Sequence, residues 1–87
     1  AQTRRAIPLI LSKRAEILVQ LADTPNAIKQ FEEAISAQKG LWKEEPHSIQ
    51  PAMDLAMSMD GIGKIWLANE KLKQAEEIYQ EMLTLLL

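Results

Sequence analysis

The chain has 87 residues, of which 47% are hydrophobic, and it carries a formal net charge of −2. This length favours one small domain with a single core, and the low charge excludes a strong overall field for nucleic acid or an anionic membrane. The lack of cysteine excludes disulfides and thiolate metal sites. Ala, Leu, Ile, Glu, Lys, Gln and Met are abundant, and this mixture favours helices.

The first helix is predicted from about Ile7 to Ala22. Pro8 then lies in its first turn, where a missing N–H costs nothing. Apolar residues at helical spacing define its inner stripe, which consists of Leu11, Ala15, Leu18 and Ala22, broadened by Ile10, Ile17 and Leu21.

A stop and a restart are predicted at Asp23-Thr24-Pro25. Asp23 or Thr24 can cap the second helix, and Pro25 suits its first position because that position needs no N–H donor. The residues of this helix that we expect to face inward are Ile28, Phe31, Ala34 and Ile35.

The end of the second helix has two interpretations. We expect the helix to run to about Lys39 and to stop at Gly40, because glycine suits a helix C-terminus. Alternatively, it continues through Trp42 towards Glu45, where Pro46 forces a break. Trp42 then either covers the core, which we favour, or is exposed as an anchor for a partner.

The third helix is predicted to begin after a cap at Ser48, with Pro51 in its tolerant first turn. Its apolar stripe comprises Ala52, Leu55, Ala56, Met59, Ile62, Gly63 and Trp66. Asn69-Glu70 is the predicted turn, and a fourth helix follows from about Lys71. Its apolar face comprises Leu72, Ala75, Tyr79, Met82, Leu83 and Leu86. No segment alternates with period two, so the fold is predicted to be all-α, with four antiparallel helices.

The two predicted hairpins repeat one pattern. Ala27, Phe31 and Ala34 recur 48 residues later as Ala75, Tyr79 and Met82, and Leu11, Ala15 and Leu18 recur as Met59, Gly63 and Trp66. Small residues within each hairpin allow its helices to approach closely, and the aromatic residues fill the space between hairpins. We therefore expect one domain with a first hairpin at about 7–40, a connection at 41–47 and a second hairpin at about 48–87.

This pattern resembles the tetratricopeptide repeat. The match is fair in GIGKIWLANEKLKQAEEIYQEML and degenerate in the first hairpin, where Arg14, Ala15 and Leu18 replace an apolar residue, a glycine and an aromatic residue. The usual period is about 34 residues, so these repeats are elongated. The apolar segment Leu83–Leu87 does not resemble a polar cap, and two repeats are few. We therefore expect a piece of a longer array, or an oligomer that stacks through this end.

The resemblance implies a non-catalytic scaffold that binds a peptide or helix of another protein in a concave groove. The groove residues would be Leu9, Ser12, Glu16, Val19, Gln20, Met57, Asp60, Lys64, Leu67 and Ala68. Some members of the family clamp a terminal carboxylate with Lys and Asn. The matching positions here include Ser12, Glu16 and Gly61, so we do not expect that clamp.

Other chemistry has weak support. Gly61-Ile62-Gly63-Lys64 is similar to the tail of a phosphate-binding loop but lacks the glycine spacing, the Ser or Thr after the lysine, and the preceding strand. His47 is the only histidine, and Ser48 beside it is better explained as a helix cap than as a nucleophile. We expect no catalytic activity, no metal site and no cofactor.

Two alternatives to peptide binding stay open. The first is a structural oligomerisation or spacer segment that self-associates through Leu83, Leu86 and Leu87. The second is a nucleic-acid or membrane adaptor that uses a basic cluster of Arg4, Arg5, Lys13 and Arg14. No aromatic residues are interleaved with this cluster for base stacking, so we favour a solvated face or contacts to a neighbouring repeat. The apolar runs are too short to span a bilayer and no signal-like segment is present, so we expect a cytoplasmic location.

Overall fold

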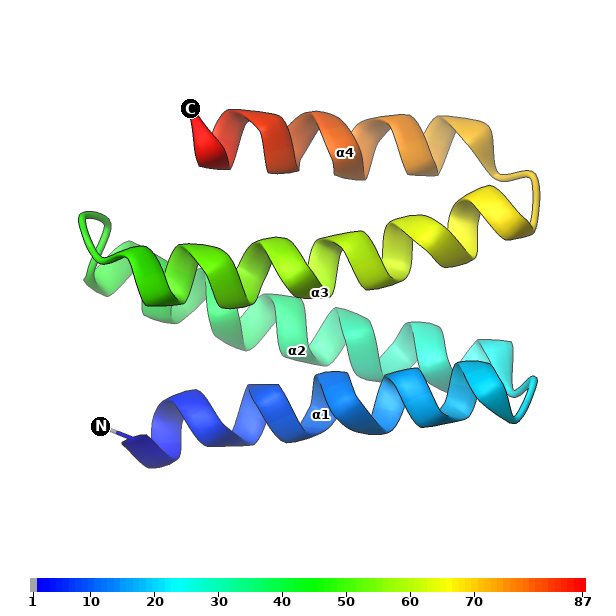
Figure 1. Ribbon diagram of the computed structural model, residues 1–87, viewed down its shortest axis with the longest axis horizontal. Helices are drawn as coiled ribbons and strands as arrows, with labels where there is room; N and C mark the ends of the chain where they lie inside the picture. Colours follow the sequence, from blue (N-terminus) through cyan, green and yellow to red (C-terminus); the bar gives the residue numbers. More distant parts are fainter. Residues whose placement is uncertain (1) are drawn as a thin grey trace.

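The computed structural model describes residues 2–87, with side chains from residue 4 onward. Within this range the chain forms four helices and no strand: α1 (Gln2–Gln20), α2 (Thr24–Glu44), α3 (Ile49–Ala68) and α4 (Leu72–Leu86). Each helix packs antiparallel on the next, and α1 also contacts α3. Figure 1 shows the α1–α2 and α3–α4 turns at one end and the α2–α3 loop at the other. The all-α prediction with four antiparallel helices is confirmed.

Helix α1 begins earlier and ends sooner than predicted. It begins at Gln2 rather than near Ile7, so Pro8 lies inside the helix and is fully buried. It ends at Gln20, and Ala22 lies in the following turn with φ of 62°. The prediction that Ala22 belongs to the inner stripe is therefore wrong, because the chain has already left the helix there.

The two turns within the hairpins have the same backbone structure. Ala22 and Glu70, which are 48 residues apart, are the two non-glycine residues with positive φ in the described chain, at 62° and 59°. In both turns the next N–H donates to the carbonyl five residues earlier: Asp23 to Leu18 at 2.9 Å, and Lys71 to Trp66 at 2.8 Å. Each turn thus ends a helix with the same left-handed motif, which satisfies the last carbonyl groups.

Helix α2 continues to Glu44, so the prediction that it stops at Gly40 is wrong and the alternative is confirmed. Gly40 is exposed and its φ is not positive. The helix continues because Trp42, two residues beyond Gly40, is half-buried and packs on the core. Asp23 and Ser48 are the N-cap residues of α2 and α3, although neither side chain forms a capping hydrogen bond.

The core lies where α1, α2 and α3 meet. It consists of Ala15, Ala27, Phe31, Ile35, Leu55, Met59, Ile62 and Ile65. Three residues predicted to broaden the inner stripe of α1 are instead exposed, namely Ile10, Ile17 and Leu21. On α4 the predicted inward residues Leu72, Leu83 and Leu86 are exposed, whereas Ile78 and Leu85 pack on the core. The helices carry apolar residues on more than one face, and periodicity alone does not identify the inner one.

Two glycines of α3 admit the aromatic rings of neighbouring helices. A Cβ atom on Gly61 would lie 2.5 Å from Phe31 of α2, and one on Gly63 would lie 2.7 Å from Tyr79 of α4. Contacts this short do not occur between real atoms, so both positions need glycine for these rings to pack. This explains why helix-weakening residues lie inside α3.

Gln38 is a polar residue that is almost completely buried. It is 1% exposed, and neither of its amide atoms hydrogen-bonds to any group among the described residues. A buried amide without a partner costs about 1–3 kcal/mol. We therefore expect Gln38→Met to raise the free energy of unfolding by about 1 kcal/mol or more in urea denaturation. Gln80→Met, at an exposed position of α4, is the control. A less stable Gln38→Met variant would mean that the amide has a partner in solution.

Candidate functional site

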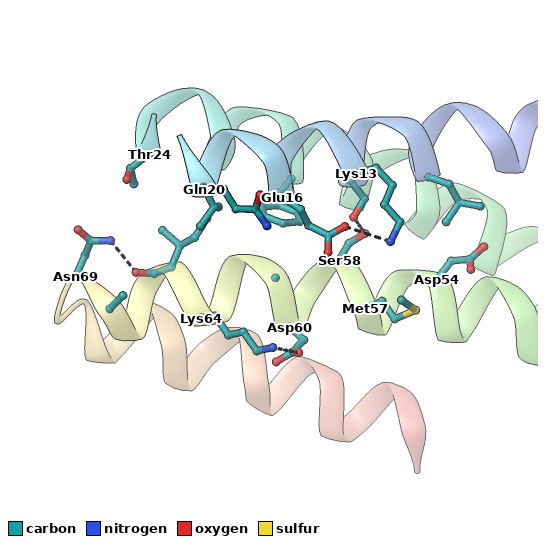
Figure 2. A pocket seen from close by; sticks show the side chains of 17 residues that line it. Lys13, Glu16, Gln20, Thr24, Asp54, Met57, Ser58, Asp60, Lys64 and Asn69 are labelled. Carbon is teal, nitrogen blue, oxygen red and sulfur yellow. Dashed lines mark hydrogen bonds and ion pairs between the residues drawn. The ribbon is translucent and has the colours of Figure 1, made fainter. Parts of the chain in front are cut away.

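A groove with a volume of about 650 Å³ runs between α1 and α3 (Figure 2). Nine of the ten residues predicted to form the groove line it: Leu9, Ser12, Glu16, Val19, Gln20, Met57, Asp60, Lys64 and Ala68. Leu67 is not among the lining residues, although it is half exposed. The structure thus brings the predicted residues of two separate helices to one cavity.

The groove also contains residues that the sequence analysis did not assign to it. They are Lys13, Thr24, Phe31, Asp54, Ser58, Gly61, Ile65 and Asn69. Phe31 and Ile65 belong to the core, and their edges reach the groove. The 48-residue repeat predicted Phe31 as a space-filling residue between the hairpins, and this position was a usable signal for the base of the groove.

The two walls of the groove are joined by a contact between serines. Ser12 of α1 and Ser58 of α3 lie 3.2 Å apart, with the Ser58 hydroxyl donating to Ser12. Both serines line the groove and Ser58 is almost fully buried, so this bond forms part of the groove's inner surface. Small hydroxyl side chains let α1 and α3 approach one another here without an unpaired polar group.

Charged side chains of both signs line the groove, where they form two ion pairs. Lys13 pairs with Glu16 on α1 at 3.4 Å, and Lys64 pairs with Asp60 on α3 at 3.3 Å. Figure 2 shows the two pairs on opposite walls. Both pairs are solvent-exposed, so they contribute little to stability and their charges are available to a ligand. Apolar side chains such as Leu9, Val19 and Met57 lie in the same groove.

Near α2 and the start of α3, Asp54 is a buried carboxylate with two partners. The Arg5 guanidinium donates to it at 2.7 Å and 3.3 Å, and the Gln50 amide donates at 2.9 Å. The hydrogen bond to Asp54 raises the pKa of Arg5, so the guanidinium stays charged. Arg4 pairs with Glu44 at 2.6 Å. Arg5 therefore reaches across to α3 in the second hairpin, which agrees with the expected contact to a neighbouring repeat, whereas Arg4 pairs within the first hairpin.

The tyrosine hydroxyl of α4 is tied to the groove wall. Tyr79 donates a 3.0 Å hydrogen bond to Asp60. Partial burial, and then this hydrogen bond and the negative charge of Asp60, raise the pKa of Tyr79 above its ordinary value. Because the folded-state pKa is the higher one, this shift favours folding below the unfolded pKa of about 10. The contribution is lost as the pH rises through the folded pKa.

Tyr79 is the only tyrosine, so ultraviolet absorbance reports its ionisation directly. We expect the phenol of the folded protein to titrate above free tyrosine. In Asp60→Asn the titration should move towards the ordinary value, because the negative charge is removed while burial remains. Glu16→Gln, which removes a groove carboxylate on the other wall, is the control. An unchanged titration in Asp60→Asn would mean that the hydrogen bond to Asp60 is absent in solution.

Within residues 2–87, no three His, Asp or Glu side chains gather in a way that would hold a metal ion. None of the helices described is both long and apolar enough to cross a membrane.

Comparison with models of known protein families, with curated proteins and with solved structures found no match. Function is therefore inferred from the groove and from the internal repeat.

Proposed function

We propose that this chain is a non-catalytic protein-interaction scaffold that binds a peptide or helix of a partner protein in the groove between α1 and α3. The observation that carries the proposal is the cavity of about 650 Å³ on that face. Its size lies within the range of ligand-binding clefts, and its lining combines apolar side chains with a few charged ones, as such clefts usually do.

We further propose that the scaffold consists of two elongated tetratricopeptide-like hairpins. Three features support this. Ala15 and Ala27 of the first hairpin and Gly63 and Ala75 of the second are all buried. The same left-handed turn ends the first helix of each hairpin. Helix α1 also contacts α3, so the first helices of the two hairpins lie on one face, where the groove is.

The chemistry of the groove favours an amphipathic ligand. Val19 and Met57 offer apolar surface from the two walls, and Lys64 and Glu16 offer opposite charges. Burial of apolar ligand side chains would supply most of the affinity, whereas the charges would fix orientation and register.

The test uses peptides selected from a random displayed library against the immobilised chain, with their affinities then measured by calorimetry. Met57→Asp replaces an exposed apolar residue of the groove, and Leu67→Asp replaces one outside it. Met57→Asp should weaken binding by about tenfold or more, whereas Leu67→Asp should change it little. Both residues lie on α3 at similar exposure, 61% and 50%, so the pair is matched for effects on the fold.

Lys64→Glu provides a second groove variant, because it reverses a charge without removing apolar surface. We expect this variant to bind more weakly those selected peptides that place a carboxylate near Lys64. The proposal fails if no selected peptide loses affinity in Met57→Asp or Lys64→Glu while circular dichroism shows unchanged helicity. It also fails if Leu67→Asp has the largest effect.

A further inference from the structure

Helix α1 has an exposed apolar stripe on the side away from the groove. The stripe comprises Ile7, Ile10 and Ile17, and Leu21 continues it in the turn just after the helix; their exposure is between 55% and 70%. These residues follow one another at three- and four-residue steps around the position of Arg14, so they form one continuous face of the helix. A row of large aliphatic side chains on a helix face indicates a packing surface.

The internal repeat identifies the kind of surface this is. A shift of 48 residues maps Ile7, Ile10 and Ile17 onto Leu55, Ser58 and Ile65 of α3. These three residues of α3 are buried: Leu55 and Ile65 belong to one core cluster with residues of α2, and Ser58 hydrogen-bonds to Ser12 of α1. The exposed stripe of α1 is therefore the counterpart of the α3 face that α2 covers.

Helix α4 carries the complementary surface. The same shift maps Ile35 and Gln38, two buried residues of α2, onto Leu83 and Leu86 of α4. Leu83 and Leu86 are both 54% exposed, and Leu87 beyond them is almost fully exposed. In one molecule, α4 thus carries the counterpart of the α2 surface, and α1 carries the counterpart of the α3 surface.

We propose that a second copy of this chain packs head to tail on the first, with α4 of one copy on α1 of the next, in the manner of α2 on α3. The charges support this occupant. Arg14 takes the place of Ile62 in the α1 stripe, and Glu76 takes the place of Ile28 on α4. Ile28 and Ile62 belong to one hydrophobic cluster within the chain, so the copies bring an arginine and a glutamate to a shared interface.

One position differs from the internal interface. Lys13 stands where α3 has Gly61, and the ring of Phe31 fits on Gly61 because no Cβ is there. In the stacked copies Tyr79 takes the part of Phe31, so α4 lies farther from α1 at this point than α2 lies from α3. The contact between copies is consequently weaker than the packing inside the chain.

The proposed contact uses different surfaces on the two partners and does not close on itself. It therefore builds an open chain of copies rather than a symmetric dimer. It also places α3 of one copy beside α1 of the next, which extends the groove from molecule to molecule. The proposal does not depend on what the groove binds.

The test is sedimentation velocity over a concentration series with two variants, each of which blocks one surface. The first is Ile10→Asp with Ile17→Asp on α1, and the second is Leu83→Asp with Leu86→Asp on α4. Ala37→Asp, at an exposed position of α2 outside both surfaces, is the control. All of these positions are exposed, so helicity measured by circular dichroism should be unchanged. Gln replaces Asp at the same sites if helicity falls.

We expect the wild type and the control to form a concentration-dependent series of species larger than a dimer. Each blocked variant alone should stay monomeric, because self-association weakens by about tenfold or more. An equimolar mixture of the two should form a dimer and nothing larger, since each keeps one intact surface. The proposal is overturned if the wild type is monomeric throughout, if either blocked variant still dimerises, or if the mixture does not.

Discussion

Replacing Phe31 with alanine is expected to lower the free energy of unfolding by about 3–5 kcal/mol. The ring is fully buried in the core between α1, α2 and α3, and it lies against the backbone of Gly61. Its loss leaves a cavity that these helices cannot fill without moving. A small domain has a total stability of about 5–15 kcal/mol, so much of the fold's margin depends on this one side chain.

Urea denaturation followed by circular dichroism measures this effect. Leu72→Ala is the control, because Leu72 is an exposed apolar residue of α4 and its truncation should cost little. Phe31 also lines the groove, so Phe31→Ala should weaken peptide binding even when the protein is folded. A loss of stability below about 1 kcal/mol would contradict the position of the ring in the core.

Alanine substitutions at the three glycines should change the free energy of unfolding by different amounts, in an order set by the space around each Cβ. Gly61→Ala is expected to destabilise by about 1–3 kcal/mol, because its Cβ would lie 2.5 Å from the buried Phe31 ring. Gly63→Ala should cost less, since its Cβ would meet the outer end of the half-buried Tyr79 ring at 2.7 Å. Gly40→Ala should stabilise by about 1 kcal/mol, because no atom lies within 4 Å and alanine favours a helix.

The same denaturation experiment distinguishes close packing from helix propensity. Propensity alone would make all three alanine variants more stable, whereas packing reverses the sign at Gly61. The double variant Gly61→Ala with Phe31→Leu should lose less stability than the sum of the two single variants, because the smaller leucine side chain leaves room for the new Cβ. Strict additivity, or a stabilising Gly61→Ala, would mean that the ring does not rest on this glycine.

Much of the fold follows from local chemistry. The turn at Asn69-Glu70 and the break before Pro46 are fixed by residues close in sequence, and both were predictable. The end of α2 was not, because glycine permits a helix to stop without requiring it. Tertiary packing of Trp42 on the core decides between the two outcomes. That contact joins residues far apart in the sequence, so local sequence preferences do not predict it.

Helix α1 shows a second limit. It has apolar residues both on the face that meets α2 and on the adjacent, exposed stripe that contains Ile10, Ile17 and Leu21. Helical periodicity groups residues into faces but does not say which face is buried by the same chain. Comparison of each position with its counterpart 48 residues away separates them, because the counterpart in α3 has a neighbour on both sides.

The groove was largely predictable because it depends on which residues share a helix face, and that follows from the repeat. Leu67 is the exception. It lies one turn after Gly63, whose face meets Tyr79 of α4, and it is half exposed without lining the groove. Ser58 was missed because its position is set by the approach of α1 to α3, a contact between hairpins with no local signature.

The most direct measurement is the change in backbone amide NMR shifts when a selected peptide is added to the labelled protein. Binding in the groove predicts that the shifted amides lie along α1 from Leu9 to Gln20 and along α3 from Met57 to Ala68, with α4 largely unaffected. Shifts confined to α4, or to the exposed stripe of α1 without the facing residues of α3, would contradict the groove as the binding site.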